Sequence, residues 1–172
     1  MERLKTRQME IIRLKKEYHN DLKEIVNITA NNLANPEWLI VMTKDEIENI
    51  FDNKNAIMYG VIDNEKLISI SGLFFDESDY LDIEKLCGIE GSRVAEIAEC
   101  MTLPEARGNN YMLKINEKII EEAKQLGFEY IIATAHPENI ASNHSLQKLG
   151  MECKGQFKRY GKYLRNYYLI KI

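Results

Sequence analysis

The fold of this 172-residue chain is decided by residues 94–150, which read VAEIAECMTLPEARGNNYMLKINEKIIEEAKQLGFEYIIATAHPENIASNHSLQKLG. The pattern predicts a strand over 94–102 and a helix over 109–126, whose apolar residues recur on one face and which a glycine follows. Residues 128–135 are apolar on both faces, as in a central strand. A second helix is expected over 139–149, again followed by a glycine.

Apolar periodicity and turn residues predict the elements on either side of this stretch. Residues 76–91 carry several acids and are expected to form an exposed loop, with a helical turn around 83–86. The whole chain, 1–172, is expected to be one mixed α+β domain. The other expected elements are strands at 9–14, 56–62, 66–75, 151–159 and 163–172, and helices at 18–33 and 43–51.

Composition narrows the class of protein. Hydrophobic residues make up 45% and charged residues 29% of the chain, which is typical of a globular protein. The net charge of −4 argues against nucleic acid as the main partner. The charged N-terminus and the lack of a long apolar run predict a cytoplasmic protein that does not cross a membrane. Three widely spaced cysteines indicate reduced thiols.

The loop over residues 104–112 joins a strand to a helix. Backbone N–H groups at a helix N-terminus are unpaired, and the helix dipole adds positive potential, so such a loop can bind a pyrophosphate. Arg107 adds a permanent charge, and Gly108 allows a close turn. The alternative is an ordinary strand–helix turn with a solvated arginine. A Rossmann fingerprint is absent.

The helix expected over 139–149 bears on the role of this loop, because the two segments carry a pair of motifs. Asn139, Ser142, Lys148, Leu149 and Gly150, together with Arg107-Gly108, resemble the paired motifs of the GNAT superfamily of N-acetyltransferases. The resemblance implies a GNAT-like fold, with a twisted mixed sheet of six to seven strands and about four helices. It also implies acetyl-CoA as cosubstrate. The residues that would hold the pyrophosphate are Arg107, Gly108, Asn109, Asn110, Tyr111 and Met112.

Two positions of this loop depart from the family pattern. Asn110 and Met112 stand where the family has small residues. Asparagine tolerates a positive φ better than most residues, so Asn110 can replace glycine. Met112 is larger than the usual residue and could crowd the pyrophosphate.

The strand at 94–102 carries the expected catalytic groups. Strand alternation places Glu96, Ala98, Cys100 and Thr102 on one face, with Glu99 and Met101 on the other. By resemblance to the histone-acetyltransferase branch, Glu96 would be the general base that a protonated amine requires. A solvated or ion-paired Glu96 is the alternative, and Glu99 is the second candidate for the base. The resemblance assigns the pantetheine arm to Cys100, Met101, Thr102 and Asn139.

The remaining candidates are less specific. Many relatives carry a tyrosine acid on the second helix, and that position here is Leu146. Tyr111, Tyr160, Tyr163 and Tyr167 are substitutes, although packing roles are more common. Trp38 could line the acceptor pocket. Cys100 is more simply a buried residue than a nucleophile. His136 and His144 have no third ligand at a recognisable spacing, so no metal site is expected.

These observations predict an N-acetyltransferase. It would transfer an acetyl group from acetyl-CoA to a primary amine of a small molecule or peptide, by direct attack in a ternary complex. A non-catalytic acyl-CoA-binding module with the same fold is the main alternative, and a nucleotide-binding domain is another. The sequence does not identify the amine, and the terminal strands could pair between two subunits of a homodimer.

Overall fold

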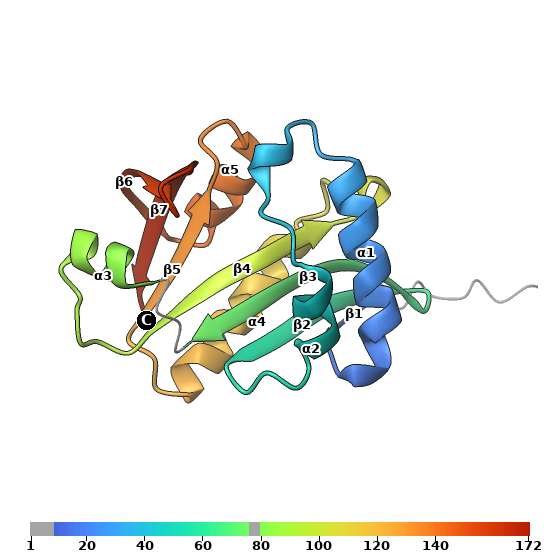
Figure 1. The fold of residues 1–172 in the computed structure, drawn as a ribbon. Coiled ribbons are helices and arrows are strands. Elements are labelled where there is room, and N and C mark those ends of the chain that lie inside the picture. The colour runs from blue at the N-terminus through green and yellow to red at the C-terminus, as the bar shows by residue number, and fades with distance from the viewer. Residues whose placement is uncertain (1–8, 76–79) are drawn as a thin grey trace, which may run out of the picture.

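Seven strands form one mixed sheet in the order β1-β2-β3-β4-β5-β7-β6 in the computed structural model, which describes residues 9–75 and 80–172 (Figure 1). Only β4 and β5 run parallel, and every other neighbouring pair is antiparallel. The strands are β1 (Met9–Arg13), β2 (Ala56–Asp63), β3 (Lys66–Phe75), β4 (Val94–Thr102), β5 (Tyr130–Ala135), β6 (Glu152–Arg159) and β7 (Tyr163–Lys171).

Helices cover both faces of the sheet. In Figure 1, α1 and α2 lie in front of β2 and β3, and α4 lies behind. The helices are α1 (His19–Asn31), α2 (Lys44–Asn49), α3 (Leu81–Cys87), α4 (Tyr111–Gln125) and α5 (Ile140–Lys148). None of them, within the described residues, combines the length and apolarity of a membrane span.

The helix boundaries all differ slightly from the expectation, and α3 and α4 are two examples. The helical turn expected around 83–86 is a seven-residue helix, α3, which raises the number of described helices from about four to five. The acids at 76–79 lie outside the described residues. Helix α4 begins at Tyr111 rather than at 109 because Asn110 takes a left-handed conformation, which a right-handed helix cannot include.

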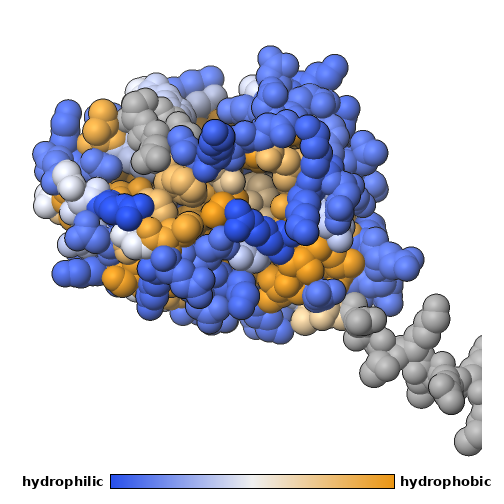
Figure 2. Space-filling model, turned by 90° about the horizontal axis from the view of Figure 1, so that it is seen from below, coloured by the Kyte–Doolittle hydropathy of each residue, from blue (hydrophilic) through white to orange (hydrophobic). Residues whose placement is uncertain are grey.

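The main core forms between the sheet and its helices. Leu22 and Ile25 of α1 and Ile115 and Ile119 of α4 are fully buried, or nearly so, in one apolar cluster. Most of the surface in Figure 2 is polar, and apolar side chains gather towards the middle of the face shown. The amphipathic helices therefore bury their apolar stripes against the sheet.

Strands β4 and β5 stay paired over only a short length. Residues 94–96 pair with 130–132, and beyond them the two strands separate, as Figure 1 shows. On their other edges, β4 stays paired with β3 and β5 stays paired with β7, and both of these pairs are antiparallel. The edges of β4 and β5 that face each other after residues 96 and 132 therefore leave backbone N–H and C=O groups without a strand partner.

A β-bulge in β4 changes which residues share a face. Ala98 pairs with Gly72 and Met101 with Ile70, so Glu99 and Cys100 together oppose Ser71. Glu99 has a φ of 55°, in the left-handed region. Simple alternation predicted Glu99 opposite to Glu96, and that prediction is wrong, because the extra residue resets the alternation. In this position the charge of Glu96 helps to raise the pKa of Glu99.

A buried amide fixes α5 to the sheet. The Asn143 Nδ2 donates to the backbone oxygens of His136 and Asn139, both at 2.8 Å. Its Oδ1 accepts from Asn166 Nδ2 at 2.8 Å and from the Tyr168 hydroxyl at 2.6 Å. Since both partner side chains come from β7, this one residue positions the start of α5 against the sheet.

Replacing Asn143 with alanine should destabilise the protein by roughly 2 to 4 kcal/mol, because several buried polar groups lose their partners together. Urea unfolding of the variant measures this free energy. Gln147→Ala, at an exposed position of the same helix, is the control and should change stability by less than about 0.5 kcal/mol. Equal effects of the two substitutions would contradict this role for Asn143.

Candidate active site

One cleft of about 570 Å³ opens where β4 and β5 separate. Its volume lies in the range of ordinary small-molecule sites. The cleft is lined by Glu96, Glu99, Trp38 and Leu146 and by every residue predicted to bind the cofactor. Those cofactor candidates are Cys100, Met101, Thr102, Arg107, Gly108, Asn109, Asn110, Tyr111, Met112, Asn139 and Ser142.

The loop before α4 contains two residues in the left-handed backbone conformation. Gly108 and Asn110 take φ values of 81° and 57°, so asparagine does occupy the left-handed position predicted for it. The Arg107 Nε donates to the Thr102 oxygen at 3.4 Å, which draws this exposed side chain towards the end of β4. The first turn of α4 adds N–H groups that have no helical acceptor.

The start of α5 lines the opposite side of the cleft. The Asn139 Oδ1 accepts from the Ser142 backbone N–H at 3.2 Å, which caps the helix. This hydrogen bond leaves the Asn139 Nδ2 free to donate to a ligand. Leu146 is buried, with 4% of its surface exposed, and its hydrocarbon side chain supplies no proton donor at this position.

Glu96 is held by an arginine that the sequence analysis did not identify. Arg159 Nη2 donates to Glu96 Oε2 at 2.9 Å and Nη1 donates to Oε1, and Nη1 also reaches Thr134 Oγ1 at 3.1 Å. Burial opposes the charge of Arg159, but the bonds and charge of Glu96 outweigh it and raise the pKa of Arg159 above its usual value. Both oxygens of Glu96 are therefore engaged by a cation.

Glu99 lies in a different environment. Its Oε2 is enclosed and accepts no hydrogen bond from the described part of the chain. Burial, followed by the charges of Glu46 and Glu96, raises the pKa of Glu99 to about 8, while Arg159 partly opposes this rise. Of the two predicted base candidates, Glu99 is the one that can exchange a proton near neutral pH.

Cys100 turns towards α4. Its Sγ lies 3.2 Å from the Ser71 hydroxyl, which donates to Asn116 Oδ1 at 2.7 Å. Burial raises the pKa of the Cys100 thiol to about 11, despite the opposing hydrogen bonds from Ser71 and Asn116. A thiol of this kind is a poor nucleophile at neutral pH, which argues against a covalent acyl-cysteine route.

The remaining candidate residues differ in whether they line the cleft. Trp38 lines the cleft from the segment between α1 and α2, and Tyr111 lines it from α4. Tyr160, Tyr163 and Tyr167 are not among its lining residues. No group of three or more potential metal ligands occurs within residues 9–75 and 80–172.

Comparison with known proteins agrees with this geometry. The family model described as the acetyltransferase (GNAT) family matches residues 19–151. Among curated proteins, no sequence matches the chain.

Many solved structures share the fold. An acetyltransferase of the GNAT family from Streptococcus pneumoniae superposes with a TM-score of 0.74 at 17% identity, covering 96% of this chain and 100% of the other. NAA60 from Arabidopsis thaliana, solved in complex with acetyl-CoA, gives 0.74 at 10% identity, with 96% and 99% coverage. An N-acetyltransferase from Staphylococcus aureus Mu50 gives 0.71 at 20% identity, with 95% and 97% coverage.

The raised pKa of Glu99 predicts a pH-dependent stability. Between the unfolded pKa of about 4.3 and the folded pKa of about 8, the folded chain holds a proton that the unfolded chain has released. The stabilisation from neutral Glu99 is thus complete below the unfolded pKa and is lost as the pH rises to the folded one. Relative to Glu99→Gln, the wild type should lose roughly 2 to 4 kcal/mol between about pH 5 and pH 8.

Urea unfolding at several pH values measures this difference. Glu117→Gln, which changes an exposed carboxylate of α4, should track the wild type across the same range. A constant difference between wild type and Glu99→Gln would show that Glu99 titrates normally.

Proposed function

The chain belongs to the acetyltransferase (GNAT) family, and from that premise we propose that it transfers an acetyl group from acetyl-CoA to a primary amine of a small molecule or peptide. The observation that carries the proposal is the single cleft between the separated strands. It joins a helix-start loop suited to a pyrophosphate to a buried carboxyl group with a raised pKa. Both substrates would occupy the cleft together, so that transfer is direct.

The residues of the cleft suit acetyl-CoA. The backbone N–H groups of 107–112 and the charge of Arg107 would hold the pyrophosphate. The open edge of β4 at Cys100–Thr102 and the Asn139 amide would pair with the pantetheine arm. Bound in this way, acetyl-CoA supplies a thioester whose carbonyl carbon is open to attack by an amine.

Glu99 is the proposed general base. An ammonium with a pKa near 10 must lose a proton before its nitrogen can attack. The ionised form of Glu99 takes that proton, the nitrogen bonds to the acyl carbon, and the carbon–sulfur bond breaks. The sulfur leaves as a thiolate, because the apolar Leu146 has no ionisable group to donate. The second proton, which the amide nitrogen releases as the carbon–sulfur bond breaks, passes to this thiolate or to solvent. Glu96, bound on both oxygens by Arg159, acts as a positioning residue.

The direct experiment measures acetyl-CoA binding by calorimetry and free-thiol release over a panel of primary amines. Saturable binding with amine-dependent thiol release is the expected result. Binding without release from any amine would favour the non-catalytic acyl-CoA-binding alternative. Failure to bind at millimolar acetyl-CoA would remove the proposal.

The pH dependence of turnover identifies the base. In the wild type, kcat should rise with pH to a plateau, with an apparent pKa near 8. Glu99→Gln should lower kcat by about 10²-fold or more and should abolish this limb. Glu117→Gln should keep the wild-type profile. If the limb persists in Glu99→Gln and disappears in Glu96→Gln, the base is Glu96.

A further inference from the structure

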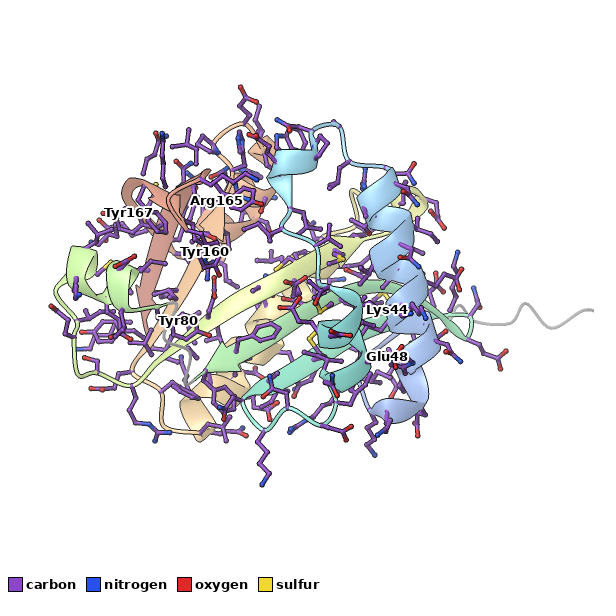
Figure 3. The ribbon with its side chains drawn as sticks, in the orientation of Figure 1. Lys44, Glu48, Tyr80, Tyr160, Arg165 and Tyr167 are labelled. Atoms are coloured by element: carbon purple, nitrogen blue, oxygen red, sulfur yellow. The ribbon has the colours of Figure 1, made fainter. Side chains whose placement is uncertain are left out.

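Arg165 of β7 is a buried cation in the lining of the cleft. Only 3% of its surface is exposed, and it lines the cleft with Trp38 and Arg159. Figure 3 shows it between β7 and the segment that joins α1 to α2. Its Nη1 donates to the Leu164 backbone oxygen and its Nη2 to the Glu37 backbone oxygen, both at 2.8 Å.

These partners are neutral. The guanidinium of Arg165 also lies over the Tyr163 ring, 5.5 Å from its centroid. Across residues 9–75 and 80–172, no carboxylate forms an ion pair with Arg165 within 4.0 Å. The Glu37 carboxylate attracts Arg165 from a distance, but it is 67% exposed and lies 4.0 Å from His136 Nε2. A buried charge without an ionic partner is costly, so it is rarely retained without a function.

The neighbouring cation, Arg159, does have an ionic partner. Arg159 is neutralised by both oxygens of Glu96, whereas Arg165 keeps its charge. Two further donors of the cleft lining, the Trp38 Nε1 and the Arg159 Nε, are enclosed and have no acceptor within the described residues. Burial and the charge of Arg159 both lower the pKa of Arg165. The part of the lining formed by Trp38, Arg159 and Arg165 therefore has donors and positive charge in excess.

Another part of the cleft lining carries acidic side chains. Glu99 lies there, within the electrostatic influence of Glu46 and Glu96, and it is the group proposed to receive the proton of the amine. An ammonium is attracted to this side, and an anion is attracted to Arg165. One ligand that meets both demands carries an amine and an acid group on the same small molecule.

We propose that the acceptor is a small amine that also bears a carboxylate, with the chemistry of an α-amino acid, and that Arg165 binds its carboxylate. This inference rests on the proposed function and defines its substrate class. An arginine fork matches a carboxylate in shape and charge, so the contact would select the free acid over its neutral derivatives. Arg165 then determines specificity, while Glu99 moves the proton.

Matched acceptors test the inference in the wild-type protein. Thiol release from acetyl-CoA is measured with the common α-amino acids and with their α-amides, which keep the amine and the side chain. The amide lowers the pKa of its amine and so favours attack, which biases the comparison against the proposal. The best free acid should nevertheless exceed its amide in kcat/KM by about tenfold or more.

Two variants test whether Arg165 is the residue that causes the preference for the free acid. Arg165→Met should abolish the preference for the free acid, and Arg165→Lys should retain part of it. Lys162→Met removes an exposed charge from the same hairpin and should keep the wild-type preference. If Arg165→Met does not fold, the ratio of Arg165→Lys decides, and a ratio equal to those of the wild type and Lys162→Met overturns the assignment.

The outcomes separate this inference from the function on which it rests. Equal or better turnover of the amides, or turnover only of amines that have no carboxylate, overturns the carboxylate site and leaves the acetyltransferase proposal intact. An absence of thiol release from every acceptor overturns both. A free-acid preference that survives in Arg165→Met also overturns the assignment to Arg165.

Discussion

The separation of β4 from β5 after three paired residues is the constraint on which the rest of the structure depends. A parallel pair inside a sheet would normally continue to bond, because unpaired backbone groups are costly when buried. Here the two strands diverge and the cleft opens between them. The exposed backbone is thus available to a ligand, and the loop before α4 and the start of α5 border the same opening.

Several interactions hold the opening in shape from both sides. Arg159 of β6 reaches Glu96 of β4 and Thr134 of β5, so it ties together strands that do not pair with it. Asn143 fixes α5 to β7 through two side-chain bonds. The bulge in β4 brings Glu99 within the electrostatic influence of Glu96. The protein in this way pairs one carboxyl group with Arg159, and it raises the pKa of the other to about 8, because Glu99 is buried and forms no ion pair within the described residues.

The sequence predicted the elements that local patterns control. The strand–loop–helix of residues 94–126 follows from spacing and residue type. The left-handed Asn110 was expected from the family resemblance, because asparagine stands there in place of a small residue and tolerates a positive φ. The face of Glu99 was predicted wrongly, because strand alternation assumes no inserted residue and nothing at 98–101 marks the bulge. Arg159 and Arg165 were missed because their partners and neighbours lie far away in the sequence, where only the folded sheet brings them together. A cytoplasmic location and a homodimer stay predictions.

The central claim is that the opening between β4 and β5 binds acetyl-CoA, and amide hydrogen exchange tests it most directly. Exchange is measured with and without saturating acetyl-CoA. The account predicts slower exchange in residues 97–102 and 107–113, and little change in β1 and β2 at the far edge of the sheet. Unchanged exchange in both of these segments under saturating acetyl-CoA, or protection confined to another surface, would contradict it.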